Sequence, residues 1–298
     1  MQLAIIIVII LSVLFLFFFI MTNIAMRPRV WTLEYGKSKM ESVPVNQGED
    51  ITVTNEHKVV SFDGYQLYVA LLPCKEDSKN YVILSHGYTS TRYGVYKYAM
   101  LYRRLGYNCV IYDNRGHGAN KKTYCTFGAR ESKDLIAIIK DTYERYGKDI
   151  HIGLHGESMG AGLQLQALQY QPEVDFIVND CGYSEILPVL RHKCRYNFHL
   201  PERIVDIASI FAKLMYGHSF HEVKPIRLLE QNQIPICFVH GEADDFIHIW
   251  HSQKMYAATK GMKEFHLFEG ATHVKCLDTD TNRYQEMLIN FLNKVYKK

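Results

Sequence analysis

Short apolar runs alternate with longer amphipathic segments from Tyr81 to the end of the chain, and this alternation limits the possible folds. Runs rich in Val, Ile, Leu and Phe are typical of buried strands, whereas apolar residues spaced three to four apart are typical of helices. The predicted strands are 81–84, 109–112, 150–154, 176–178, 236–239 and 265–268. The predicted helices are 93–105, 131–146, 158–170, 249–259 and 282–296. The pattern predicts an α/β fold with a mostly parallel sheet covered by helices on both faces.

Two further segments complete the predicted domain. Residues 57–62 and 65–72 flank Asp63-Gly64, which suits a two-residue hairpin turn, so an antiparallel pair is expected to open the sheet. Roughly fifty residues, about 182–233, separate two predicted strands and include a helical stretch at 203–216. An insertion of this length predicts a helical cap rather than a crossover, within a folded domain that covers 56–298.

The N-terminus is strongly apolar. The first 26 residues contain no Asp, Glu, Lys or Arg, and only Ser12 interrupts the apolar run 3–21. At about 1.5 Å per residue this segment can cross a bilayer core of roughly 30 Å. A cleavable signal peptide would begin with basic residues and have a shorter apolar region. We therefore predict a transmembrane anchor at 1–26, followed by a linker at 27–55.

Basic residues follow the predicted anchor and none precede it. They are Arg27, Arg29, Lys37 and Lys39. Because cytoplasmic flanks carry an excess of Lys and Arg, the pattern favours a cell-membrane protein with a single N-terminal span and its catalytic domain on the cytoplasmic side.

Composition excludes several classes of partner. The 298 residues carry a net charge of only +3, and no run of Arg or Lys is interleaved with aromatic residues, so no nucleic-acid partner is expected. The seven cysteines are odd in number and form no C-x-x-C pair. This spacing argues against a disulfide framework or a zinc knuckle and favours free thiols in a reducing compartment.

The segment Gly156-Glu157-Ser158-Met159-Gly160 lies between a predicted strand and a predicted helix. A serine between two glycines at such a junction has the form of a nucleophile elbow. The tight turn brings neighbouring backbone close, so positions two before and two after the serine must be small. Ser158 is therefore the candidate nucleophile.

A serine hydroxyl needs a histidine to take its proton and a carboxylate to orient that histidine. Asp244 follows the predicted strand 236–239, and His273 follows 265–268. Because parallel strands bring their carboxyl ends to one edge of the sheet, these side chains are expected to meet Ser158 there. Asp180 and Asp245 also follow strands and remain alternatives for the acid.

The order Ser, Asp, His along the chain is the one that α/β-hydrolases use. Residues 56–298 resemble that superfamily, and in particular bacterial serine hydrolases with an H-G-x-x-D segment and an N-terminal membrane segment. Besides the elbow, the resemblance rests on Ser85-His86-Gly87-Tyr88, Asp113-Asn114-Arg115-Gly116-His117-Gly118 and His240-Gly241-Glu242-Ala243-Asp244. It implies the α/β-hydrolase fold, with a mostly parallel eight-stranded sheet and a helical cap.

The resemblance also implies residue roles. It matches Asp244 to the catalytic acid, and it assigns the oxyanion hole to the backbone N–H groups of Tyr88 and Met159. Only one glycine follows His86, so the chain lacks the HGGG loop of some lipases and esterases. Within the segment 113–118, Asp113 and Arg115 are expected to brace the loops around the site.

Other chemistries lack their motifs. Neither a P-loop nor G-x-G-x-x-G is present, so no nucleotide cofactor is expected. His218 and His221, like His248 and His251, are spaced three apart without a third clustered ligand, so no metal is expected. Epoxide hydrolases and haloalkane dehalogenases share the fold but carry aspartate at the elbow, which Ser158 argues against.

We predict a membrane-anchored serine hydrolase that cleaves a carboxylic ester or thioester of a small-molecule or lipid-like acyl substrate. A serine aminopeptidase-like peptidase and an acyltransferase are enzymatic alternatives, and a noncatalytic binding protein on a hydrolase fold is an alternative from another class. The pattern specifies neither the acyl group nor the oligomeric state.

Overall fold

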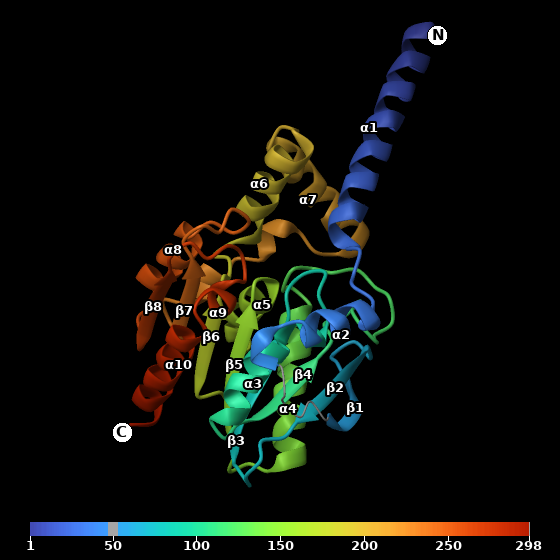
Figure 1. Cartoon of the computed structure of the whole chain (residues 1–298). Coiled ribbons are helices and arrows are strands. Elements are labelled where there is room, and N and C mark those ends of the chain that lie inside the picture. Colours follow the sequence, from blue (N-terminus) through green and yellow to red (C-terminus); the bar gives the residue numbers. More distant parts are fainter. Residues whose placement is uncertain (47–52, 298) are drawn as a thin grey trace.

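The computed structural model describes residues 1–46 and 53–297, and its centre is an eight-stranded sheet (Figure 1). The strand order is β1-β2-β4-β3-β5-β6-β7-β8. The strands are β1 (Thr54–Val60), β2 (Gln66–Leu72), β3 (Asn80–Ser85), β4 (Asn108–Tyr112), β5 (His151–Glu157), β6 (Phe176–Asp180), β7 (Ile236–Gly241) and β8 (Lys263–Phe268). The pairs β1–β2 and β2–β4 are antiparallel, and every other pair is parallel.

Helices cover both faces of this sheet (Figure 1). The helices of the described residues are α1 (Gln2–Met26), α2 (Leu33–Glu41), α3 (Tyr96–Arg104), α4 (Glu131–Tyr146), α5 (Met159–Ala167), α6 (Ile186–Phe198), α7 (Arg203–Tyr216), α8 (Trp250–Ala258), α9 (Cys276–Thr279) and α10 (Thr281–Tyr296), of which α3, α4, α5, α8 and α10 pack on the sheet. Val82 and Leu84 of β3 pack with α3 and α10 on one face, while Tyr81 and Ile83 pack with α4, α5 and α8 on the other. The alternation of side chains along a strand thus gives the sheet two apolar cores. This arrangement confirms the predicted α/β-hydrolase fold.

Helix α4 has the predicted bounds, and local chemistry explains them. Glu131 and Asp134 lie in its first turn and Arg145 in its last, where each charge complements the helix dipole. Gly147 ends the helix with φ +108°, and its N–H donates to the Tyr143 carbonyl at 3.1 Å. Its apolar stripe, which includes Leu135, is buried against the sheet.

The β1–β2 connection differs from the predicted two-residue turn. Val60 pairs with Gln66, so residues 61–65 form the connection, and the Ser61 N–H donates to the Tyr65 carbonyl at 2.8 Å. The wider loop turns the Asp63 carboxylate toward the buried Arg115, whose guanidinium lies 3.2 Å away. Tertiary ion pairing, which Asp63-Gly64 cannot reveal by itself, therefore sets the length of the loop.

The segment predicted as a linker contains helix α2 and packs onto the domain. Thr32 caps α2, because its side-chain oxygen accepts from the Tyr35 N–H at 3.1 Å. The Trp31 N–H donates to the Thr89 carbonyl at 2.9 Å, and Met40 is buried in the core that includes α3. The predicted linker also includes residues 47–52, which lie outside the described residues.

Helices α6 and α7 lie between β6 and β7, in the segment predicted as a cap, and α7 contacts α1 where α1 leaves the domain (Figure 1). The ring of Phe211 lies 5.3 Å from that of Phe15 and 5.6 Å from that of Phe18, centroid to centroid. Among the described residues, α1 is the one helix long and apolar enough to cross a membrane.

Candidate active site

The elbow holds Ser158 in a strained backbone conformation between β5 and α5. Its φ is +54° and its ψ is −117°, in a region that residues other than glycine rarely adopt. The Ser158 N–H donates to the Asp180 carbonyl at 2.8 Å, which fixes the turn against β6. A Cβ on Gly156 would lie 2.4 Å from the carbonyl carbon of Gly160, and one on Gly160 would lie 2.0 Å from the Ser85 carbonyl oxygen. Both glycines are therefore required by close backbone packing.

Ser158, His273 and Asp244 form a continuous hydrogen-bonded chain. His273 Nε2 lies 2.9 Å from Ser158 Oγ, and His273 Nδ1 lies 2.7 Å from Asp244 Oδ2. The three residues come from the loops after β5, β8 and β7 respectively. The structure thus brings together, at the carboxyl ends of parallel strands, the three side chains that the sequence singled out.

The surroundings of Asp244 fix the proton positions along this chain. Burial raises the pKa of the Asp244 carboxyl, but hydrogen bonds from His273 and from the Ile247 N–H outweigh it and lower the net pKa. An ionised carboxylate only accepts hydrogen bonds, so His273 Nδ1 carries a proton toward Asp244, and Nε2 is the nitrogen that faces Ser158 Oγ. The second carboxylate oxygen accepts from the N–H groups of Phe246 and Ile247, each at 2.9 Å. Asp244 is therefore fixed in place by the backbone of its own loop.

The alternative acids occupy other positions. Asp180 is fully buried, and its Oδ2 accepts from the hydroxyls of Tyr98 at 2.9 Å and Tyr284 at 2.8 Å. Asp245 is exposed, and its backbone carbonyl faces His192 Nε2 at 3.1 Å. Asp244 is thus the acid that contacts His273 in this structure.

Two other histidines near the site, His86 and His240, form ring hydrogen bonds with neighbouring residues rather than with Ser158. His86 Nε2 accepts from the Asn114 N–H at 2.9 Å, and burial lowers the pKa of His86 to about 3. His240 Nε2 lies 2.7 Å from the Ile247 carbonyl, and its Nδ1 lies 2.7 Å from Ser252 Oγ. These imidazoles link the loops around the site.

The segment 113–118 braces neighbouring loops with buried ion pairs, as its residues predict. Arg115 is fully buried, and its Nε lies 2.6 Å from the Asp134 carboxylate of α4. Asp113 pairs with Arg92 and also accepts from the Ala119 N–H at 2.9 Å. Asp113 and Arg115, with their ion-pair partners, thereby fix the loop that follows β4.

A buried lysine that the sequence reasoning missed ties the nucleophile segment to the base segment. Lys97 of α3 is 7% exposed; its Nζ donates to the Val274 carbonyl at 2.8 Å and lies 3.5 Å from the Glu157 carboxylate. Glu157 precedes Ser158 and Val274 follows His273. Burial lowers the pKa of the Lys97 ammonium, but the nearby acidic groups, Glu157 first and then Asp278 and Asp180, together raise it above its ordinary value. The contacts form only in the fold, and no motif marks them.

The two residues assigned to the oxyanion hole lie at different positions around the nucleophile. Met159 is the first residue of α5, where helix geometry leaves a backbone N–H without an intrahelical acceptor. Tyr88 lies in the loop after β3, and its hydroxyl donates to the Ala25 carbonyl of α1 at 2.7 Å. The end of α1 therefore contacts the loop that carries Tyr88, a link that the sequence did not predict.

Apolar side chains pack against the residue after the nucleophile and against the base. Met159 belongs to a buried cluster with Met26, Cys125, Phe127 and Tyr183. On the opposite side of the base, the Phe246 ring stacks on His273 with a centroid distance of 4.8 Å. Phe246 also lines a hollow of about 220 Å³ between α6 and α8, whose lining residues do not include Ser158.

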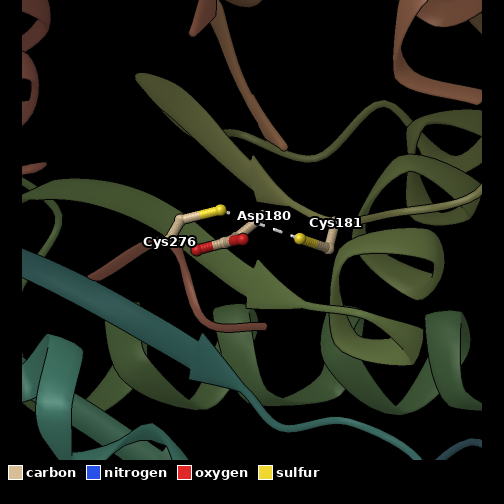
Figure 2. Close-up of side chains that lie close together, drawn as sticks. All are labelled: Asp180, Cys181 and Cys276. Carbon is tan, nitrogen blue, oxygen red and sulfur yellow. Dashed lines mark hydrogen bonds between the residues drawn. The ribbon is translucent and has the colours of Figure 1, made fainter. Parts of the chain in front are cut away.

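Figure 2 shows a second group of polar side chains beside the sheet, in which Asp180, Cys181 and Cys276 point toward one another. Their ligand atoms lie within 4.8 Å of each other, and the two sulfurs are 4.0 Å apart. Burial raises the pKa of the Cys181 thiol well above its ordinary value, whereas a metal needs the thiolate. All seven cysteines are free thiols. We assign no metal to this group.

Two sequence comparisons find a family and a protein that are similar to this chain. The family described as serine aminopeptidase S33 matches residues 76–181, which include Tyr88 and Ser158 but neither Asp244 nor His273. An uncharacterized protein of Bacillus subtilis (strain 168), YqkD, is 29% identical over 225 residues, which cover 74% of this chain and 73% of that protein.

Solved structures share the fold. The Pyrococcus furiosus esterase Pf2001 is 21% identical with a TM-score of 0.68, over 90% of this chain and 96% of that one. The α/β hydrolase GrgF from a Penicillium species is 16% identical with a TM-score of 0.64, over 82% and 99% of the two chains. The esterase EaEST from Exiguobacterium antarcticum is 16% identical with a TM-score of 0.58, over 80% and 100%.

Proposed function

We propose that this chain is a serine hydrolase of the α/β-hydrolase superfamily that cleaves a carboxylic ester or thioester through an acyl-serine intermediate. The observation that carries the proposal is the hydrogen-bonded chain from Ser158 through His273 to Asp244, joined to the strained backbone at Ser158. A seryl hydroxyl beside an oriented, neutral imidazole is the arrangement that acyl transfer needs.

The proposed reaction has two halves. Ser158 Oγ attacks the carbonyl carbon while His273 Nε2 takes its proton, and the N–H groups of Tyr88 and Met159 stabilise the negative charge on the carbonyl oxygen. The bond to the leaving alcohol or thiol breaks as His273 returns the proton to it. Water then attacks the acyl-serine while His273 takes its proton, and the bond to Ser158 Oγ breaks as His273 returns that proton to Oγ, which releases the acid and restores the enzyme.

The surroundings of the nucleophile favour an ester over a peptide with a free amino terminus. An aminopeptidase needs an accessible acidic group to bind the substrate ammonium, whereas Glu157 and Asp180, the carboxylates beside Ser158, are buried and each is held by groups inside the domain. Glu157 pairs with Lys97, and Asp180 accepts from two tyrosine hydroxyls. The side chains that pack with Met159 are apolar and offer no charged group to a substrate ammonium.

The match to the serine aminopeptidase family supports a peptidase as the second candidate. The matched residues 76–181 hold the nucleophile but end before α6 and α7. Because the segment over an active site shapes what it accepts, this match bears on the reaction type more than on the substrate.

We also propose that α1 is an uncleaved membrane anchor on a cytoplasmic catalytic domain. The contacts at its C-terminal end support retention, since Met26 is 1% exposed and its carbonyl accepts from the Cys125 N–H at 2.7 Å. Arg27 and Arg29, directly after the helix, support the sidedness.

The test uses the full-length protein in detergent with p-nitrophenyl esters of graded chain length and, beside them, aminoacyl p-nitroanilides. We expect ester turnover that falls at least about a thousandfold in Ser158→Ala. Ser38→Ala, an exposed serine of α2, is the matched control and retains the wild-type rate. Turnover of anilides without esters supports the peptidase, and a wild-type rate in Ser158→Ala refutes both.

A further inference from the structure

Helix α7 carries two apolar faces, of which only one is needed for packing inside the domain. The inward face is buried and consists of Val205, Ala208, Ala212 and Tyr216. A second face, here called the α7 outer face, consists of Ile207, Ile210, Phe211 and Leu214. Its spacing of three and four residues places these side chains on one stripe of the helix. Ile207, Ile210 and Leu214 are 40%, 60% and 78% exposed.

The α7 outer face is continuous with the apolar surface of α1. Phe211, the fourth member of the face, packs on Phe15 and Phe18 of α1, and the Thr22 hydroxyl donates to the Ala208 carbonyl at 3.3 Å. No residue in the most apolar stretch of α1 is buried. Figure 1 shows α7 beside the lower part of α1, while the upper part of α1 extends away from the domain.

The contacts also set the depth of α7 relative to a membrane that α1 crosses. If residues 3–22 fill a hydrocarbon core of about 30 Å, Phe18 lies about 6 Å and Phe15 about 10 Å inside its edge. Phe211 touches both rings and therefore lies at the same depth. Interfacial amphipathic helices bury their apolar face about 5–10 Å into this boundary.

The polar groups at the base of α1 and on α7 lie where this depth would place lipid headgroups or water. At the base of α1, the Tyr216 hydroxyl donates to Asn23 Oδ1 at 2.6 Å and accepts from Arg27 Nε at 3.4 Å, which suits the headgroup level. On α7 itself, Asp206 pairs with Arg191 at 2.5 Å and Lys213 with Glu222 at 2.7 Å. Both of these charges lie on the polar side of the helix, away from the α7 outer face.

We propose that the α7 outer face inserts into the acyl-chain region of the bilayer that α1 crosses, so that the segment over the active site is itself a membrane-contacting element. The partner is lipid rather than a second copy of this chain, because the face lies at hydrocarbon depth and continues the surface of the spanning helix. The proposal rests on α1 as an anchor and is independent of whether Ser158 hydrolyses an ester.

The experiment places a fluorescent probe on this face in the full-length protein. In a Cys74→Ser background, where the other six cysteines are buried, Ile210→Cys and Leu214→Cys are labelled with NBD. The protein is reconstituted into phosphatidylcholine and phosphatidylglycerol vesicles with lipids that carry a nitroxide at a shallow or a deep acyl position. Lys140→Cys, an exposed position on α4, is the matched control.

We expect blue-shifted emission at both α7 positions and at least twofold quenching by the nitroxide lipids, with neither effect at position 140. Quenching at 210 and 214 no greater than at 140 overturns the proposal. Blue-shifted emission that nitroxide lipids do not quench, and that reverts on dilution of the protein among vesicles, identifies a second copy as the partner and also overturns it. A thermal unfolding midpoint within a few degrees of wild type shows that the labelled proteins are folded, whether or not they hydrolyse esters.

Discussion

Ser158 and His273 lie on separate loops, and Lys97 is the side chain that links the residues beside them. Through Glu157 and the Val274 carbonyl it contacts the residue before the nucleophile and the residue after the base. Because a displacement of about 1 Å in a catalytic pair can cost about a hundredfold in rate, such a link acts on catalysis without contacting the substrate. Lys97 is a positioning residue in this account.

Replacement of Lys97 by Met tests that role. The change frees the Val274 carbonyl and leaves the Glu157 carboxylate buried without its partner, which costs about 3–5 kcal/mol. We expect kcat for esters to fall about 10- to 100-fold with little change in KM, together with a lower Tm. Steady-state kinetics and thermal unfolding measure the two effects separately.

The double variant Lys97→Met with Glu157→Gln separates positioning from stability. It removes the unpaired charge, so Tm is expected to recover while kcat stays low. Full recovery of kcat together with Tm would mean that Lys97 acts only through stability.

Asp63 gives a pH-dependent stability prediction. Burial raises its pKa, but hydrogen bonds and charge from Arg115 and Arg130 lower it from an ordinary value of 3.8 to about 2. A lowered carboxyl pKa stabilises the fold above the unfolded value, and this contribution is lost as pH falls from about 4 to about 2. Because Asp63 is exposed and solvent screens its ion pairs, we take this shift as about 1 kcal/mol at neutral pH.

We therefore expect Asp63→Asn to lower Tm by about 2–4 °C at pH 7, with the difference from wild type shrinking toward pH 2. Asp149→Asn is the matched control, because Asp149 forms an exposed pair with Lys79 and such pairs contribute little. An Asp63→Asn deficit of equal size at pH 7 and pH 2 would contradict the linkage.

Charged substitutions on helix α7 test whether its outer face lies in lipid. If its outer face lies in lipid, the double variant Ile210→Asp with Leu214→Asp places two charges in the acyl-chain region. We expect the rate on esters embedded in vesicles to fall at least tenfold, while the rate on p-nitrophenyl acetate in detergent stays within twofold of wild type. Equal losses on both substrates would indicate damage to the fold instead.

Strands and helices were predictable from the sequence where burial imposes a repeating pattern of apolar residues. The six apolar runs became β3 to β8 because each lies between two layers of helices, and the glycines of the elbow were recognisable because close backbone packing permits no Cβ there. The helix predicted at 93–105 instead begins as a 3₁₀ turn, Arg92–Val95, before α3. Arg92 is held there by Asp113, a partner 21 residues away that local periodicity does not reveal.

The molecule as a whole joins the predicted anchor to the active site. The residues at the end of α1 do not simply lead into a linker: Ala25 accepts from the Tyr88 hydroxyl and Met26 is buried in the cluster that holds Met159. Sequence patterns predicted a membrane segment and an elbow separately, because each is local. Their contact depends on how α1 packs against α7 and the β3 loop, which no spacing in the sequence encodes.

The central claim, that Ser158 is the nucleophile of a serine hydrolase, is tested most directly by a fluorophosphonate probe followed by mass spectrometry of the intact chain and of its peptides. The account predicts one adduct per chain, on the peptide that contains Ser158, no adduct in Ser158→Ala, and much slower labelling in His273→Ala. A folded wild-type protein that takes no label, or a label that persists in Ser158→Ala, would contradict it.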